Sequence, residues 1–416
     1  MRKMKDSGVA WVGAIPNHWR VSKIKQIVRW KSVKGQPDLP VLSLYRDYGV
    51  IPKDSRDDNH NVTSLDTSGY KVVECGDLVI NKMKAWQGSL AVSEYNGIVS
   101  PAYHICKINS ANICKKYLHY LLRDASYLPE YMRLSTGLRV GQWDLSFDDF
   151  KNIPFLIPPL AEQERIAAFL DAECAEIDAV LEKTRASIEE YKKLKQAVIT
   201  QAVTKGIRGD RPMKDSGIEW IGEIPAEWGV VPHKRIMHKV KEICEQYNEK
   251  DIISLTVNGV VKRDLTAGGK MPTSFDGYQY VEPNDLLLCL FDIDVTPRCV
   301  GVVRDYGVTS PAYSRFVMHD GYYNAYYDYL LRIIDDNKVF VHLSKNLRSS
   351  LTESDFGAIK TCAPPLAEQK CIAAFLDVRC DEIDALIVKK QQYLTEIENY
   401  KKSLIYEYVT GKKEVV

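Results

Sequence analysis

Two stretches of the chain carry a hydrophobic pattern that repeats every seven residues. In the first stretch the pattern consists of Leu170, Ile177, Thr184, Tyr191 and Val198, with a second row at Cys174, Leu181 and Ile188. In the second stretch it consists of Leu376, Ile383, Lys390, Ile397 and Leu404, with a second row at Cys380, Ile387 and Leu394. Thr184 and Lys390 interrupt the two patterns at equivalent places. A seven-residue repeat is typical of coiled-coil helices. We therefore predict two helices of about 40 residues, each roughly 60 Å long.

The segments before these helices have a different pattern. Short β-rich runs, broken by frequent turn residues, alternate with two short helical patterns near Tyr117–Arg123 and Tyr326–Arg332. The β-rich runs are 41–45, 77–81, 286–291 and 301–304. This mixture indicates an α+β fold. We interpret Trp11, Trp19, Trp220 and Trp228 as packing residues rather than binding residues.

The chain contains an internal duplication with a period near 208 residues. Residues 4–21 (MKDSGVAWVGAIPNHWRV) and 213–230 (MKDSGIEWIGEIPAEWGV) are identical at eleven of eighteen positions. The Ser-Pro-Ala-Tyr sequence at 100–103 returns at 310–313, and Tyr-Leu-Leu-Arg at 120–123 returns at 329–332. Residues 158–183 match 364–389 at eighteen of twenty-six positions. Between these landmarks the two copies diverge, which suggests one scaffold that presents two different surfaces.

The duplication predicts the topology. The first helix leaves one domain and reaches the second, and the second helix leaves its domain by the same geometry, so it should return antiparallel to the first. We predict globular domains over 1–157 and 207–363 and spacer helices over 158–206 and 364–416. The expected fold class is α+β: two tandem-duplicated mixed domains joined by two long antiparallel coiled-coil helices with pseudo-two-fold symmetry. The helix pair would act as a spacer.

Charge differs between the two copies. The whole chain carries a net charge of only +1. Residues 1–157 hold 22 Lys/Arg against 15 Asp/Glu, a net +7, whereas residues 207–363 hold 19 against 22, a net −3. Only the first copy has the basic excess expected of a phosphate-binding surface. The ten cysteines form no CxxC pair, which favours reduced thiols in a cytoplasmic protein and argues against a zinc site.

Several of these motifs together resemble a known family. They are Gly8-x-x-Trp11-x-Gly13-x-Ile15-Pro16-x-x-Trp19, the Ser-Pro-Ala-Tyr sequence, Pro-Pro-Leu-Ala-Glu-Gln at 158–163, and Ala-Val-Thr-Lys-Gly at 202–206, repeated loosely at 408–411. The combination resembles the specificity (S) subunit of type I restriction–modification systems over nearly the whole chain. The resemblance implies two target recognition domains, each reading one half of a split, asymmetric double-stranded DNA site. It also implies a non-catalytic subunit that assembles with two methyltransferase (M) subunits and with restriction (R) translocase–nuclease subunits.

The residues themselves favour a chain without catalytic apparatus or cofactor. No G-x-x-x-x-G-K-[ST] loop for ATP occurs. The two Pro-Pro pairs follow Ile157 and Ala363 and precede leucine, so they indicate helix starts and not the Asn/Asp-Pro-Pro-aromatic motif of an amino-methyltransferase. The eight histidines include no i,i+4 pair. No stretch approaches the length of an apolar membrane span.

Direct reading of DNA requires Arg, Lys, Gln or Asn on exposed loops. In the first domain our candidates are Lys82, Lys84, Trp86 and Gln87, then Arg139, Gln142 and Trp143, then Arg46, Lys53 and Arg56. In the second domain they are Lys345, Asn346 and Arg348, then Lys262, Arg263 and Arg298. We expect the repeated Arg123 and Arg332 to be structural.

A second hypothesis stays open at this point. The chain could be an adaptor whose two domains bind proteins rather than DNA, and the −3 charge of residues 207–363 favours it. A DNA mobility shift in the presence of a methyltransferase subunit would distinguish the two. A self-sufficient restriction enzyme is disfavoured because no cofactor loop is present.

Overall fold

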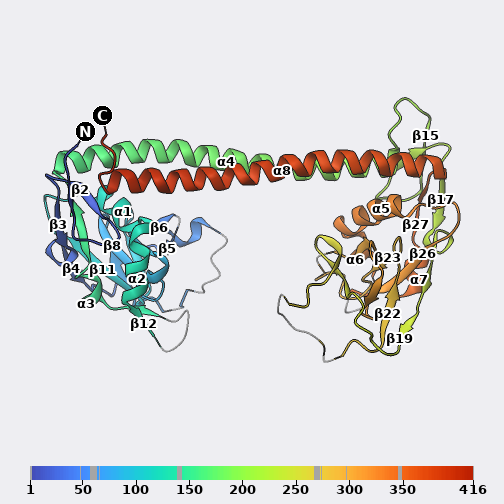
Figure 1. Cartoon of the computed structure of the whole chain (residues 1–416), viewed down its shortest axis with the longest axis horizontal. Helices are drawn as coiled ribbons and strands as arrows, with labels where there is room; N and C mark the ends of the chain where they lie inside the picture. Colours follow the sequence, from blue (N-terminus) through green and yellow to red (C-terminus); the bar gives the residue numbers. More distant parts are fainter. Residues whose placement is uncertain are drawn as a thin grey trace. The chain divides into compact units, whose positions relative to one another are not determined.

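The structure is a computed structural model that describes residues 2–46, 48–56, 63–64, 66–137, 143–266, 272, 274–296, 298–344 and 349–415. It divides into two compact units (Figure 1). Unit 1 contains residues 1–185 and 392–416, and unit 2 contains residues 186–391. Each unit therefore includes a piece of both long helices.

An antiparallel sheet in the order β4-β11-β8-β9 forms the centre of unit 1. Its strands are β4 (Val28–Lys31), β11 (Tyr103–Ile108), β8 (Asp77–Asn81) and β9 (Leu90–Val92). Five smaller antiparallel strand pairs complete the described part of unit 1. They are β1 (Met4–Asp6) with β2 (Ala14–Pro16), β3 (Arg20–Lys23) with β14 (Pro154–Ile157), and β5 (Leu42–Tyr45) with β6 (Gly49–Pro52). The other two are β7 (Lys71–Val73) with β10 (Gly97–Val99) and β12 (Ser135–Thr136) with β13 (Asp144–Leu145). Its short helices are α1 (Lys115–Arg123), α2 (Leu128–Leu134) and α3 (Phe147–Phe150), with 3-10 turns at Ile24–Gln26, Lys53–Ser55, Ala85–Gln87 and Ala125–Tyr127.

Unit 2 repeats this plan. Its central sheet runs β18-β26-β23-β24, with β18 (Met237–Val240), β26 (Ser314–Met318), β23 (Leu286–Leu288) and β24 (Val300–Val302). A second sheet joins β19 (Ile243–Cys244), β22 (Tyr278–Val281) and β25 (Gly307–Thr309), and pairs form between β15 (Met213–Asp215) and β16 (Glu223–Pro225), β17 (Gly229–Pro232) and β27 (Lys360–Ala363), and β20 (Ile253–Thr256) and β21 (Gly259–Lys262). The short helices are α5 (Asn324–Asp336), α6 (Val339–Leu343) and α7 (Glu353–Ala358), with a 3-10 turn at His233–Arg235. The predicted α+β class is confirmed for both copies.

The long helices are α4 (Leu160–Lys205, 46 residues) and α8 (Leu366–Val409, 44 residues). Each begins directly after a Pro-Pro pair, because proline fixes a helix-compatible backbone angle but lacks the N–H that a helix interior needs. Both helices continue across the positions where the heptad pattern is interrupted. At Thr184 the hydroxyl donates to the carbonyl of Val180 at 2.8 Å, so the helix itself satisfies this buried polar group.

Each globular core includes the start of one long helix and the end of the other. Unit 1 buries Ile166 and Leu170 from α4 together with Leu404 and Val409 from α8. In unit 2 the two helices change places, because its core contains the start of α8 and the end of α4. The residues are Ile372, Ala373 and Leu376 from α8 and Ile199, Ala202 and Val203 from α4. The helices are thus part of the hydrophobic cores as well as connectors.

The two helices run antiparallel within each unit. In unit 1 Lys401 forms an ion pair with Asp178 at 2.6 Å and Arg185 one with Glu398 at 2.6 Å. In unit 2 Lys195 pairs with Asp384 at 2.6 Å, and the ammonium of Lys390 lies 5.6 Å from the ring centroid of Tyr191. A higher residue number on α4 accompanies a lower one on α8 within each unit. The predicted antiparallel arrangement is confirmed.

Residues from the start of each copy hold the first turn of a long helix. In unit 2 Arg211 lies over Trp228, 5.2 Å from the ring centroid, and donates to the Glu368 carboxylate at 2.6 Å. The indole N–H of Trp228 donates to the same carboxylate at 2.9 Å. In unit 1 the same contact joins Arg2 to Glu162, over the ring of Trp19. We call each of these contacts a helix clamp.

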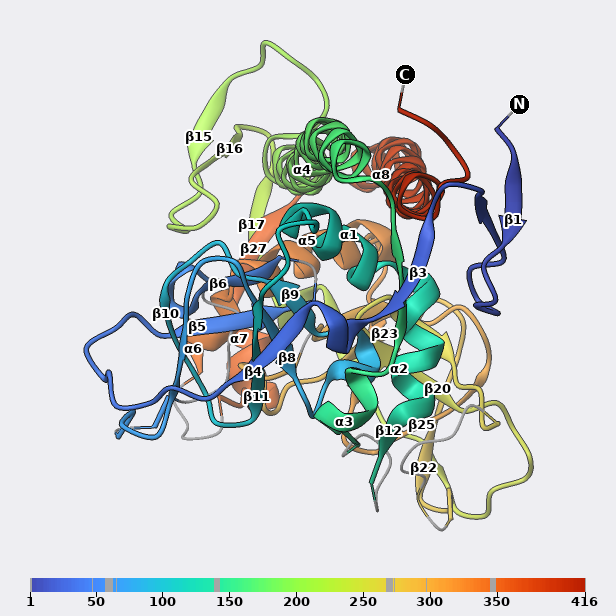
Figure 2. The same cartoon turned by 90° about the vertical axis from the view of Figure 1, so that its left-hand side faces the viewer.

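The end of the chain completes unit 1. Figure 2 shows the β1-β2 hairpin standing beside the last residues of the chain, where the Lys412 ammonium donates to the carbonyl of Val12 at 3.0 Å. The Tyr117 hydroxyl donates to the carbonyl of Val409 at 3.1 Å, just as Tyr326 in unit 2 donates to the carbonyl of Val203 at 2.8 Å.

Some expected elements differ in detail from the structure. The β-rich run at 286–291 forms a strand only over Leu286–Leu288, and the run at 301–304 is β24 shifted by one to two residues. The apolar residues beyond Leu288 leave the ladder and form a loop. Trp19 and Trp228 are fully buried, which confirms their packing role. Arg332 pairs with Asp328 and Arg123 donates to the backbone of the β5-β6 turn, as expected of structural residues.

Candidate nucleic-acid interface

The loop that follows β8 presents the first group of predicted DNA-contacting residues. The strand ends at Asn81, and a 3-10 turn over Ala85–Gln87 closes on Gly88, whose φ of +83° favours glycine. Ala85 is fully buried and fixes the turn to the domain, while Lys84 and Gln87 are exposed. The loop therefore presents two polar side chains from an anchored backbone.

A second segment packs against this loop. The backbone N–H of Leu145 donates to the carbonyl of Lys82 at 2.9 Å, and the Lys82 ammonium pairs with Asp144 at 2.9 Å. The Trp86 and Trp143 rings meet edge to face with centroids 5.3 Å apart. The structure thus brings together two candidate groups that lie roughly 60 residues apart in the sequence. Arg139 and Gln142, from the second group, lie outside the described residues.

Lys71, Lys34 and Lys82 lie near one another beside this loop surface. Lys71 has only 8% of its surface exposed, and its ammonium donates to the Tyr103 carbonyl at 2.6 Å. Burial, together with the positive charges of Lys34 and Lys82, lowers the pKa of Lys71 below its ordinary value. Several cations therefore share this region, which is the arrangement that attracts a phosphate backbone.

Sequence reasoning missed one aromatic residue in this region. Trp30 is 44% exposed at the edge strand β4, and its ring lies 4.9 Å from that of His104 and 4.8 Å from that of Phe147. The Lys71 ammonium lies 5.5 Å from its ring centroid. An exposed tryptophan beside a cation suits contact with sugar or base surfaces. In the sequence it stands in an ordinary β-strand, so only its exposure in the folded domain distinguishes it.

The remaining candidates of unit 1 lie on and beside the β5-β6 hairpin. Arg46 is exposed in the turn of the hairpin. Lys53 donates to the hydroxyl of Thr63, and Arg56 stacks on Tyr48, with the guanidinium 4.3 Å from the ring centroid. These contacts orient the Lys53 and Arg56 side chains along the surface of the domain.

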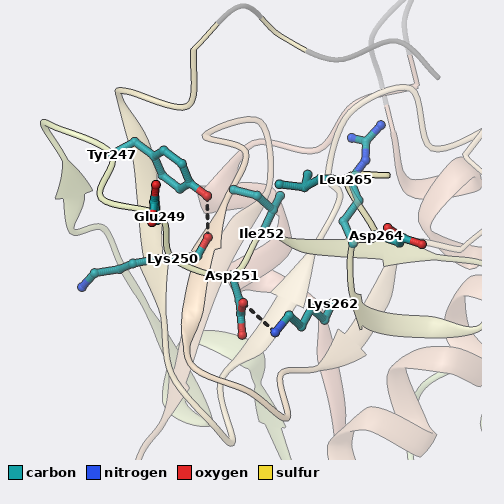
Figure 3. A pocket seen from close by; sticks show the side chains of 9 residues that line it. Tyr247, Glu249, Lys250, Asp251, Ile252, Lys262, Asp264 and Leu265 are labelled. Carbon is teal, nitrogen blue, oxygen red and sulfur yellow. Dashed lines mark hydrogen bonds and ion pairs between the residues drawn. The ribbon is translucent and has the colours of Figure 1, made fainter. Parts of the chain in front are cut away.

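In unit 2 two candidates line a pocket of about 660 Å³ (Figure 3). Lys262 and Arg263 both line the pocket, and Lys262 pairs with Asp251 at 2.6 Å. Tyr247 also lines it, and its hydroxyl donates to the Lys250 carbonyl at 2.6 Å. Acidic and basic side chains alternate around the rim, so the pocket lacks the cationic excess found in unit 1.

Arg298, a further candidate of unit 2, has its guanidinium bound to backbone carbonyls. Arg298 donates to the carbonyls of Val300 at 2.9 Å and Val257 at 3.4 Å, and thereby ties the β20-β21 turn to β24. Burial and the nearby charge of Arg332 lower the pKa of Arg298. These contacts favour a positioning role for Arg298. Lys345, Asn346 and Arg348 lie outside the described residues.

None of the described helices is long and apolar enough to cross a membrane. The described residues contain no cluster of three or more His, Cys, Asp or Glu side chains arranged to hold a metal ion.

Comparison with known proteins agrees with these features. Residues 16–190 match the family model described as type I restriction modification DNA specificity domain. The putative type I restriction enzyme MjaX specificity subunit of Methanocaldococcus jannaschii is 23% identical over 97% of this chain and 96% of its own length. The type I restriction enzyme MjaVIII specificity subunit of the same organism is 24% identical over 96% of this chain and 94% of its own length.

A solved structure shares the fold. Its report concerns the structural basis of complex assembly and conformational transition of the type I R-M system, and the alignment has a TM-score of 0.70 at 14% identity. It covers 96% of this chain and 99% of the other. The duplicated domains, the paired long helices and the sequence matches agree with one another. The chain matches the type I restriction modification DNA specificity domain over residues 16–190 and is similar along nearly its whole length to specificity subunits of type I restriction enzymes.

Proposed function

We propose that this chain reads a bipartite, asymmetric DNA site and directs methyltransferase and restriction subunits to it. Residues 1–157 would read one half of the site and residues 207–363 the other, with the helices over 158–206 and 364–416 as the spacer. The observation that carries the proposal is the duplication: the frame of the two units repeats, while the loops at their surfaces differ in sequence and charge. Two different surfaces on one frame suit two different half-sites.

The repeated surface supports a partner present in two copies. Met4, Lys5 and Asp6 on β1 are exposed, and the identical residues Met213, Lys214 and Asp215 on β15 are exposed as well. The aspartates accept a turn hydrogen bond from Gly8 and Gly217. An exposed methionine at the same place in both copies suits a surface that contacts a partner. Two methyltransferase subunits, one at each unit, fit this repeat, and the complex would act on DNA in the cytoplasm.

Methylome sequencing of the host, with and without this gene, tests the proposal. We expect one bipartite motif, with two short specified parts separated by a fixed gap, to lose its methylation when the gene is deleted. Restoring the gene should restore the same motif. An unchanged methylome, or loss of a continuous motif without a gap, would contradict the proposal.

The charges predict how the chain binds DNA by itself. Unit 1 has a cationic surface, but residues 207–363 carry a net −3, so that part adds little phosphate affinity of its own. We expect the isolated chain to bind DNA weakly, and affinity and specificity to rise steeply when methyltransferase subunits are added. Fluorescence anisotropy on a labelled duplex carrying the motif would measure both. Tight, sequence-specific binding by the chain alone would contradict this expectation.

A further inference from the structure

The loop between β23 and β24 of unit 2 is the structural counterpart of the loop between β8 and β9 of unit 1. In unit 1 the N–H of Leu145 donates to the carbonyl of Lys82 at 2.9 Å, and in unit 2 the N–H of Leu351 donates to the carbonyl of Leu290 at 2.8 Å. Both loops leave the same strand of the central sheet and return along its neighbour. They therefore occupy the same place in their domains.

The two loops carry opposite chemistry. The unit 1 loop contains Lys82, Lys84 and Gln87. The first part of the unit 2 loop reads Leu290-Phe291-Asp292-Ile293-Asp294-Val295-Thr296, without lysine or arginine. The arginine of this loop, Arg298, stands just before β24, and its guanidinium donates to the carbonyls of Val300 and Val257. Val295 has 74% of its surface exposed and Phe291 has 38%, and Asp294 is also exposed. A valine exposed to this degree on an anchored loop, beside a carboxylate, has no role in the packing of unit 2.

The conformation of the unit 2 loop is fixed by internal contacts. Ile293 is fully buried, and its N–H donates to the carbonyl of Ser349 at 3.1 Å. The carbonyl of Asp292 accepts from the N–H groups of Val295 at 3.2 Å and Thr296 at 2.9 Å. The backbone φ is +46° at Asp292 and +43° at Ser349. Residues other than glycine rarely adopt this left-handed conformation. The anchored Ile293 leaves Asp294 and Val295 directed outward from the surface.

A carboxylate in this position suits base edges and not phosphates. Phosphate oxygens repel a carboxylate, whereas the exocyclic amino groups of cytosine and adenine donate to one in the major groove. The methyl group of thymine is the apolar feature of the same groove, and a small aliphatic side chain fits against it. A loop with an exposed aspartate and an adjacent exposed valine can therefore read an amino group and a neighbouring thymine.

We propose that Asp294 and Val295 determine the specificity of the second half-site, with Asp294 accepting from a cytosine or adenine amino group and Val295 contacting a thymine methyl group. This inference rests on the proposed function, because it requires unit 2 to face DNA. It also accounts for the net negative charge of residues 207–363: the loop contributes base discrimination, and phosphate affinity comes from elsewhere in the assembly.

The test uses the full complex of this chain with its methyltransferase subunits. The methylation rate is measured on duplexes that carry the motif with each single base substitution. Asp294→Asn is compared with Asp320→Asn, which removes the same charge from an exposed turn of unit 2, and with Lys84→Gln in unit 1. We expect Asp294→Asn to lower discrimination about tenfold or more at one position of one half-site. Asp320→Asn should leave every preference unchanged, and Lys84→Gln should act only on the other half-site.

A base analogue isolates the valine contact. Replacing single thymines of the second half-site with uracil removes only the methyl group. We expect one such replacement to slow methylation by the unaltered complex several-fold, and Val295→Ala to make thymine and uracil equivalent there. Two outcomes would overturn the inference. In the first, Asp294→Asn and Val295→Ala keep the base preferences of the unaltered complex. In the second, Asp294→Asn raises the methylation rate on all duplexes alike, as removal of a negative charge alone would. If the unaltered complex recognises no two-part motif at all, the proposed function fails instead.

Discussion

At the scale of single residues, the helix clamp explains why certain residues recur in both copies. Trp228 and Glu368 stand 140 positions apart in the sequence but form one hydrogen bond, completed by Arg211. The glutamate also lies in the first turn of its helix, where the helix dipole favours negative charge. The repeat of Trp and Glu was visible in the sequence, but the arginine that joins them was not recognisable as their partner.

The clamp in unit 2 predicts a loss of stability on substitution. Arg211 and Glu368 have side chains that are only 10% and 9% exposed. Arg211→Leu leaves a buried carboxylate without its cation, so we expect the free energy of unfolding of unit 2 to fall by about 3 kcal/mol. A denaturant titration followed by tryptophan fluorescence would measure it, since Arg211 lies over Trp228. The exposed Arg208→Leu is the matched control, and equal losses in both variants would exclude the clamp.

The clamp in unit 1 has a defined pH dependence. Burial alone would raise the pKa of Glu162, but hydrogen bonds from His18 and Arg2 hold its pKa below the ordinary value. When folding lowers the pKa of a carboxyl group, the group stabilises the fold at pH values above its pKa in the unfolded chain. This stabilisation is lost as the pH falls through its pKa in the folded chain. It therefore acts at neutral pH and is lost in acid below about pH 4.5.

His233 predicts a pH effect at milder acidity. Its ring is fully buried, 4.6 Å from that of Phe356, and burial lowers its pKa to about 3. The unfolded chain takes up a proton near pH 6.5 and the folded chain does not, so stability falls as pH drops below about 6.5. As the pH falls from about 6.5 to about 5, we expect the protonation of His233 in the unfolded chain to lower the free energy of unfolding of unit 2 by about 2 kcal/mol.

Substitution isolates that contribution. In His233→Phe the difference between stabilities at about pH 6.5 and pH 5, measured by denaturant titration, should shrink by this amount. His342→Phe, at an exposed position, should keep the slope of the unaltered chain. A His233→Phe variant with an unchanged slope would show that His233 is protonated in the folded domain.

At the scale of elements, the sequence predicts what depends on periodicity or repetition. The heptad rows indicated α4 and α8, and the apolar run at 77–81 predicted β8 with its observed ends. Surface loops follow no period, so the contact between Trp86 and Trp143 could not be foreseen. In unit 2 the expectation of cationic DNA contacts selected Lys262 and Arg298 but not Asp294 and Val295, because an aspartate beside a valine resembles no binding motif.

The helix pair predicts how the gap between half-sites could be altered. We expect an added helical segment near Thr184 and Lys390 to lengthen the gap, and the contacts between the helices guide its placement. Arg185 pairs with Glu398 and Lys390 contacts Tyr191, so insertions must face each other to keep these pairs in register. One heptad inserted after Ser187 and one after Tyr393 preserve the coiled-coil phase. At 1.5 Å per residue they add about 10 Å, which is about three base pairs.

Methylome sequencing of a host that carries the altered gene checks this prediction. Both half-sites should keep their sequence while the gap between them grows. A heptad inserted into only one helix is the control, because it breaks the pairing and should abolish methylation. An unchanged gap in the doubly extended protein would contradict the role of the helices as a spacer.

At the scale of the whole molecule, the segment 22–157 is suited to exchange because both of its ends lie in one strand pair. Residues 22–157 begin on β3 and end on β14, and these strands pair with each other, Val21 opposite Leu156. Both junctions of an exchange therefore fall in one strand pair. We expect replacement of residues 22–157 by those of a relative to change one half-site and leave the other and the gap intact. Methylome sequencing measures all three, and a change in both half-sites would show that the units do not read DNA separately.

The composition of unit 1 has a consequence for synthesis of the protein. Its core requires Leu404 and Val409, which the ribosome adds more than 200 residues after the first globular segment. Domains ordinarily fold in the order in which they are translated, yet here the core of unit 1 is completed only by residues that are translated after unit 2. Unit 2, whose residues are contiguous, can close earlier. During translation unit 1 would thus stay incomplete until unit 2 has been made, so a half-finished chain never has both units folded.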